Sequence, residues 1–320
     1  MAKAKKPSRS AGARKTPAPT KKPTPPRSRA PSSAPERRVR TDAPPPGPVL
    51  RPVPLYEFTA GGLAGQVRLA DPGRGLDLIQ GVEGKVLPAI SQEVLSLRHY
   101  LSRGDSGLLA PREEAACEGK VEKHGVVFSY DSPRNWPVTA VARYELRAEG
   151  GADATFTFRF TKALKGFEAG VETLMPRSRP GIYVHSGGQW THASAGPQSQ
   201  RFYPRNLGAA ELIVDGRWDG LRLGGAALSV EPRGYDYPML VVRDERSGWA
   251  LVYMALTEEC SSVWVNSAQR SIGFGLVGGD VKAQSSAVCR LRVALCQANR
   301  LADVLPHYRA FVQEARAARR

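Results

Sequence analysis

Two histidines on either side of a tryptophan are the clearest candidates for proton chemistry in this sequence. His185 in GIYVHSGGQW and His192 in QWTHAS flank a Gly-Gly turn and Trp190. Imidazole titrates near neutral pH, so either histidine could donate a proton to a bound molecule, and the indole could stack on its ring. The alternative is a pair of ordinary loop residues, because any two of the 5 histidines can fall close together by chance.

Three glutamates could act as the matching base. Glu172 falls in KGFEAGVETLMP, where apolar residues alternate with Glu and Gly, so we expect it on the polar side of a strand. Glu258 and Glu259 follow the apolar run WALVYMALT. Neighbouring residues of a strand point to opposite faces, so only one of this pair can enter a pocket. A solvated strand end is the alternative interpretation.

Five further residues could hold a ligand. Trp264 and Asn266 in VWVNS stand two apart and share one face of a strand, where an aromatic ring beside an amide suits a sugar. Arg201, Tyr203 and Arg205 in RFYPRN could grip an anionic sugar such as a uronate or a sugar phosphate. The alternatives are a tryptophan that fills the core and a solvated loop.

No metal or cofactor is expected. The 4 cysteines form no CxxC pair and no histidine stands at ligand spacing from one, so we predict reduced thiols. Cys289 and Cys296 are expected on opposite faces of one strand. The glycine-rich stretches GLVGGD and GGLAG lack the features of a phosphate-binding loop, and no GxSxG or HExxH occurs.

Strands must position these residues. Between 138 and 161, VTAVARYELRAEGGADATFTFRFT alternates apolar and polar residues on both sides of a Gly-Gly turn, which predicts an antiparallel hairpin with one buried face. Short strand patterns with turns between them follow to residue 297, which indicates a β-sandwich or barrel. Residues 91–101 suit a helix or a strand. An apolar stripe after residue 299 predicts a closing helix with Asn299 as its N-cap.

The positive charge belongs to the N-terminal segment. Residues 1–40 contain 13 of the 46 Lys and Arg and one acid, and 14 of the 26 prolines precede residue 55. Such a segment cannot bury enough apolar surface to fold, so we predict a disordered tail over 1–53 and one folded domain over 54–320. Residues 1–40 are a solvated tether or an arm that binds nucleic acid or another polyanion.

Targeting signals are not evident in the sequence. No run approaches the roughly 18 apolar residues of a membrane span, and the charged start has no apolar stretch of a secretory signal behind it. The sequence therefore predicts a cytoplasmic protein. Its oligomeric state is left open.

Two segments carry a resemblance to a known family. ARYELRAEGGADATFTFRFTKALKGFEAGVETLMP resembles the central strands of galactose mutarotase-like proteins, and WVNSAQRSIGFGLVGGDVKAQSSAVCRLRVALCQ resembles the end of that fold. The resemblance covers roughly 54–312. It implies an all-β supersandwich of two large antiparallel sheets with a short C-terminal helix, and a carbohydrate bound on the concave outer face of one sheet.

The same resemblance implies a chemistry. Ring-opening epimerisation needs an acid at the ring oxygen and a base at the anomeric hydroxyl, which here would be His185 or His192 with Glu172, Glu258 or Glu259. The family's Asn-His-x-Tyr/Phe-Phe stretch is missing. We therefore expect a carbohydrate-binding protein, with a sugar epimerase or another carbohydrate-processing enzyme as the catalytic form. The alternative is a non-catalytic interaction module or scaffold with a basic tail.

Overall fold

Strands make up most of the described chain, as the alternating patterns predict. The computed structural model describes residues 55–69, 75–80, 92–102, 105–109, 116–132, 136–175, 181–193, 200–204, 222–223, 226–227, 233–266 and 270–319. All of them belong to one compact unit, Arg51–Arg320. The expected tail lies outside the described residues, so the division at residue 54 stays a prediction.

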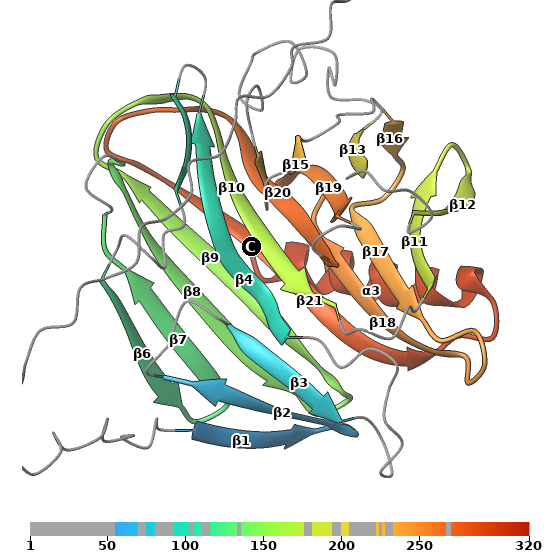
Figure 1. Cartoon of the computed structure of the whole chain (residues 1–320). Coiled ribbons are helices and arrows are strands. Elements are labelled where there is room, and N and C mark those ends of the chain that lie inside the picture. Colours follow the sequence, from blue (N-terminus) through green and yellow to red (C-terminus); the bar gives the residue numbers. More distant parts are fainter. Residues whose placement is uncertain are drawn as a thin grey trace, which may run out of the picture. The chain divides into compact units, whose positions relative to one another are not determined.

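One large sheet has ten strands (Figure 1). In spatial order they are β1 (Leu55–Ala60), β2 (Leu63–Arg68), β3 (Leu76–Gln80), β4 (Gln92–Ser102), β10 (Leu164–Leu174), β20 (Ser271–Val281), β19 (Cys260–Asn266), β13 (Gln200–Pro204) and β16 (Arg233–Tyr235), with β5 (Asp105–Leu109) paired to β4. The pairs are antiparallel except β13 with β16, which is parallel.

The other large sheet has nine strands, all antiparallel. Their order is β12 (Gln189–His192), β11 (Gly181–Ser186), β17 (Met239–Arg243), β18 (Trp249–Ala255), β21 (Ser285–Gln297), β9 (Gly151–Phe160), β8 (Val138–Arg147), β7 (Gly125–Tyr130) and β6 (Cys117–Glu122). A separate two-stranded pair joins β14 (Arg222–Leu223) and β15 (Ala226–Ala227). The expected fold class, two large antiparallel sheets with a C-terminal helix, is confirmed.

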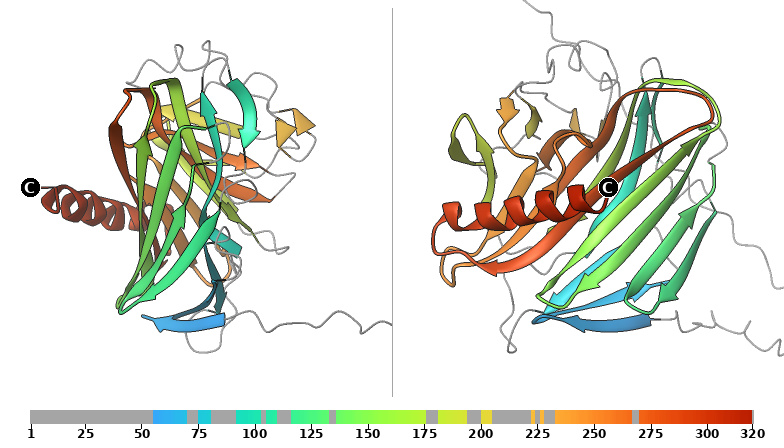
Figure 2. Two further views of the ribbon diagram at one scale, coloured as in Figure 1. Left: turned by 90° about the vertical axis from the view of Figure 1, so that its left-hand side faces the viewer. Right: turned by 180° about the vertical axis from the view of Figure 1, so that it is seen from behind.

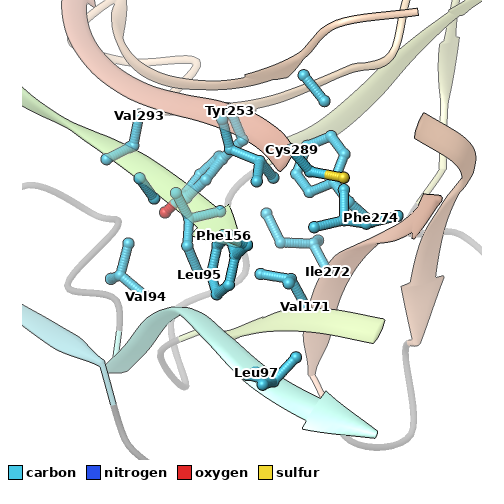
Figure 3. Packing of buried hydrophobic residues seen from close by; sticks show 14 of the residues in the cluster. Val94, Leu95, Leu97, Phe156, Val171, Tyr253, Ile272, Phe274, Cys289 and Val293 are labelled. Carbon is cyan, nitrogen blue, oxygen red and sulfur yellow. The ribbon is translucent and has the colours of Figure 1, made fainter. Parts of the chain in front are cut away.

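The predicted central hairpin is β8 and β9. Ala140 lies opposite Phe158 and Tyr144 opposite Ala154, so the alternating apolar residues of both strands share a face. That face packs against the ten-stranded sheet. Figure 3 shows Phe156 of β9 beside Leu95 and Val171 of the other sheet, in the core that both sheets enclose.

The segment that suited either a helix or a strand is strand β4. Val94 and Leu95 are neighbours, yet both are buried in the inter-sheet core. Leu95 has a left-handed φ of 52°, which interrupts regular alternation along the strand. This irregularity explains why the apolar residues of this segment also fit a helical stripe.

The chain ends in a 3-10 turn, η3 (Leu301–Val304), and the helix α3 (Leu305–Ala317). The predicted cap was wrong: Arg300, not Asn299, caps η3, and its backbone N–H donates to Asp303 Oδ2 at 2.8 Å. Pro306 lies in the first turn of α3, where its missing N–H costs nothing. Among the described residues, no helix is long and apolar enough to cross a membrane.

Helix α3 covers the outer face of the nine-stranded sheet (Figure 2). Its Tyr308 and Phe311 pack with residues of β17, β18 and β21 in a second apolar cluster. Cys296 belongs to this cluster, whereas Cys289 of the same strand lies in the inter-sheet core. The two thiols therefore face opposite sides of β21, as their spacing predicts.

Candidate functional site

The residues that the sequence singled out lie in three places. His185, His192 and Trp190 belong to β11 and β12 of the nine-stranded sheet, and Glu258 and Glu259 to the turn between β18 and β19. Glu172, Arg201, Tyr203, Trp264 and Asn266 belong to the ten-stranded sheet. The side chain of Tyr203 and the whole of Arg205 lie outside what the structure describes.

His185 lies within hydrogen-bond distance of Asp236, a residue that sequence reasoning did not consider. Its Nδ1 lies 2.8 Å from Oδ2 of Asp236, which also accepts the Gly188 N–H at 2.7 Å. The ring centroid lies 5.0 Å from that of Trp190 and 5.1 Å from that of Tyr237. These contacts hold His185 beside α3, because Tyr237 in turn packs on Tyr308.

His192 lies on the neighbouring strand β12. Its ring contacts Tyr183, with centroids 5.1 Å apart. Tyr183 and Trp190 both pack against the cluster under α3. The two histidines therefore belong to the outer side of the nine-stranded sheet, and the structure does not bring them together with Glu172.

Glu258 and Glu259 join the sheets to the end of the C-terminal helix. Glu258 accepts hydrogen bonds from Arg316 and Arg319. Glu259 accepts Nη1 of Arg290 at 2.9 Å and also pairs with Arg319. Burial raises the pKa of Glu259, and its hydrogen bonds act against that shift. This network ties the C-terminal end of the chain to β21.

The outer face of the ten-stranded sheet, turned away from the core, carries the remaining candidates. On β10, Phe167, Ala169 and Val171 enter the core, so Glu168 and Glu172 point to the other side. The sequence predicts this side for Glu172. It is not an open surface, since Glu168 is fully buried and Glu172 is 3% exposed.

Arg201 reaches Glu168 across two intervening strands. Its Nη1 donates to Glu168 Oε1 at 2.8 Å and lies 3.4 Å from Ser262 Oγ. On β20, glycine makes room for this contact: a Cβ at Gly275 would lie 2.7 Å from the Glu168 carboxyl carbon. The Arg201 guanidinium also lies over the Trp264 ring, 4.7 Å from its centroid.

A bulge in β4 turns two consecutive side chains to this same face. The pairing with β10 shifts between His99, opposite Gly170, and Leu97, opposite Val171, which leaves Arg98 as the extra residue. Arg98 Nε lies 3.2 Å from Glu172 Oε2. His99 lies over Gly170, where a Cβ would come within 2.1 Å of the imidazole.

His99 and Trp264 form a tilted aromatic pair over two glycines of the sheet. Their ring centroids are 5.7 Å apart, and the indole covers Gly273, whose Cβ would lie 2.2 Å from it. Burial, assisted by the charge of Arg201, lowers the pKa of His99 from 6.5 to about 4. His99 is therefore a neutral imidazole at pH 7, with one nitrogen that donates and one that accepts.

Several buried polar atoms on this face have no hydrogen-bond partner within the part of the chain that the structure describes. Among the described residues, nothing bonds to either ring nitrogen of His99, to Nε1 of Trp264, to Nη1 of Arg98 or to Oγ of Ser271. Buried polar atoms in folded proteins are nearly always hydrogen-bonded. This concentration of buried donors and acceptors on one sheet face marks it as the candidate site.

We call this set of side chains the polar face; its members are Arg98, His99, Glu168, Glu172, Arg201, Trp264, Asn266 and Ser271. Asn266 stands two residues after Trp264 on β19, shares its side of the strand and is 1% exposed. Sequence reasoning missed His99. Its only signal is a charged and a titratable residue within the apolar segment EVLSLRHYL.

No protein-family model and no curated protein matches the chain. Solved structures with similar folds include a putative aldose 1-epimerase from Escherichia coli K12, with 10% identity and a TM-score of 0.44, covering 77% of this chain and 100% of that one. A galactose 1-epimerase from Lactobacillus acidophilus NCFM has 11% identity and a TM-score of 0.41, covering 76% and 95%.

A third similar structure is the ligand-free alpha-N-acetylgalactosaminidase from Bifidobacterium bifidum. The identity is 11% and the TM-score 0.49, over 81% of this chain and 39% of that protein. The names belong to those proteins and are not transferred to this chain. At 10–11% identity, each of these likenesses is a likeness of fold.

Proposed function

We propose that the polar face binds a carbohydrate. The observation that carries the proposal is the set of buried, unpartnered donors and acceptors on His99, Trp264, Arg98 and Ser271. Every sugar hydroxyl both donates and accepts, so a monosaccharide satisfies many such atoms at once. A site built to hydrogen-bond hydroxyls rejects molecules that lack them, because its buried polar atoms then stay unpaired.

The side chains of the polar face take different roles in this proposal. Arg201 and Gly273 lie against the Trp264 ring. The ring edge is left to bind a ligand, and its Nε1–H can donate a hydrogen bond there. Neutral His99 offers one donor and one acceptor. The carboxylates of Glu168 and Glu172 are held by Arg201 and Arg98, so both are fixed in position before a ligand arrives.

The polar face would also convert the bound sugar in this proposal, by an aldose epimerase-like reaction. This reaction needs a proton donor and a base on one sugar. In the proposal Glu172 is the base, and neutral His99 donates a hydrogen bond to the ring oxygen, because the two residues lie on adjacent strands of the same face, whereas His185 and His192 lie on the other sheet. Mutarotation of a pure anomer, followed by polarimetry, tests this step separately from binding.

Ligand-observed NMR with a panel of neutral monosaccharides tests binding. We expect saturation transfer to at least one sugar in the wild type, and loss of at least about tenfold in affinity in Trp264→Phe, which removes the Nε1–H and keeps an aromatic ring. Trp190→Phe on the nine-stranded sheet is the matched control. Absence of any sugar signal, or equal loss in both variants, would contradict the proposal.

A further inference from the structure

The positive charges on the polar face are already paired inside the protein. Arg201 Nη1 lies 2.8 Å from Glu168 Oε1, and both side chains are fully buried. Arg98 Nε lies 3.2 Å from Glu172 Oε2, with the glutamate side chain 4% exposed. The two arginines and the two glutamates that face one another there balance in charge.

Among the described side chains of the polar face, an anionic ligand would therefore meet a carboxylate beside each arginine. A carboxylate or phosphate placed beside Arg201 comes close to Glu168, and one beside Arg98 comes close to Glu172. Like charges at such distances repel strongly when water is excluded. His99 cannot offset this, because burial and Arg201 keep its pKa at about 4 and the ring uncharged at pH 7.

We propose that the polar face selects uncharged sugars and rejects uronates and sugar phosphates. This inference rests on the proposed function and names its substrate class. In place of the anion grip that the sequence suggests for Arg201, the guanidinium fixes Glu168 and packs on Trp264. The unpartnered Nη1 of Arg98 is a donor to a hydroxyl of the neutral ligand.

Matched sugar pairs test the selection. Galactose against galacturonate, glucose against glucuronate and glucose against glucose 6-phosphate differ only in the group at carbon 6, and binding is measured by calorimetry and NMR on the full chain. We expect the neutral member of a pair to bind at least about tenfold more tightly. Equal or tighter binding of the anion overturns the inference and leaves sugar binding intact, whereas no binding of either member overturns the proposed function itself.

Removing one carboxylate charge tests whether the ion pairs cause the preference for neutral sugars. Glu168→Gln leaves Arg201 uncompensated, so the preference for the neutral sugar should fall by at least about tenfold. Glu172→Gln provides the same test at Arg98, whose side chain is 27% exposed, should the first variant fail to fold. Glu258→Gln, at the helix end, is the control that keeps the wild-type preference. An unchanged preference in a folded Glu168 or Glu172 variant contradicts the charge argument.

Discussion

Arg201 and Glu168 meet although strands β19 and β20 separate them. Neighbouring strands lie about 4.8 Å apart, so the two backbones are about 14 Å apart, and the gap closes because both side chains extend flat along the sheet. Gly275 between them leaves the space. The result is an ion pair with 0% exposure of both side chains.

Removing one partner of this ion pair should destabilise the protein more than replacing both partners with apolar residues. Arg201→Met leaves Glu168 charged and buried, so we expect the free energy of unfolding to fall by about 3–5 kcal/mol. The double variant with Glu168→Leu removes both charges and should recover most of that loss. Urea unfolding followed by circular dichroism measures both; a single variant as stable as the wild type would show that the pair is not desolvated.

The central hairpin should not tolerate a charge on its inner face. Phe158 is 0% exposed and its ring packs edge-on against Tyr100 and Phe167. Phe158→Asp should lower the free energy of unfolding by more than about 4 kcal/mol and abolish a cooperative transition. Thr157→Asp, on the opposite face of β9, is the control and should change it by less than about 1 kcal/mol. A cooperative Phe158→Asp variant would refute the core assignment.

Glycine at position 273 should be needed for the orientation of Trp264. A Cβ there would lie 2.2 Å from the indole and 2.5 Å from the Val171 carbonyl oxygen. Gly273→Ala should therefore cost about 1–3 kcal/mol and shift the tryptophan emission as the ring moves. Gly279→Ala is a matched control on the same strand, because nothing lies within 4 Å of its added Cβ. Equal effects in both variants would refute the close packing.

The buried His99 should make stability depend on pH. Its pKa is lowered from 6.5 to about 4, so between these values the unfolded chain binds more protons than the folded one. The contribution of His99 to the free energy of unfolding is complete above pH 6.5. It decreases by about 3 kcal/mol in all as the pH drops toward 4. Unfolding measured at several pH values should lose this component in His99→Gln and keep it in His124→Gln, whose side chain is exposed. An identical pH dependence in wild type and His99→Gln would contradict this account.

The basic segment is tested by its removal. The alternative hypothesis assigns polyanion binding to residues 1–40, which lie outside the described residues. Deletion of residues 1–50 should then abolish binding to a random DNA duplex, and the affinity of the full chain should fall steeply with salt. The deletion should leave sugar binding unchanged. DNA binding that survives the deletion would place the polyanion site in the folded unit.

The periodicity of apolar residues predicted the strands and the helix whose buried faces depend only on neighbours along the chain. Alternation at a period of two assigned inner and outer faces to β8, β9 and β10, and a stripe at helical spacing found α3. The same rule placed Glu172 on the outer side of its strand and Cys289 and Cys296 on opposite sides of theirs. It failed at β4, because the left-handed φ at Leu95 and the bulge at Arg98 break the period.

The sequence by itself determined which residues are polar, which face of each regular strand they occupy, and that two-faced sheets would form. The tertiary structure alone decided which strands lie side by side, and hence that Arg201 meets Glu168 from 33 residues away. It also decided that His99, and neither His185 nor His192, shares a face with Glu172. Side-chain alternation depends on neighbours in the chain, whereas strand order depends on how distant apolar faces pack. The strand order therefore cannot be predicted from any local sequence pattern.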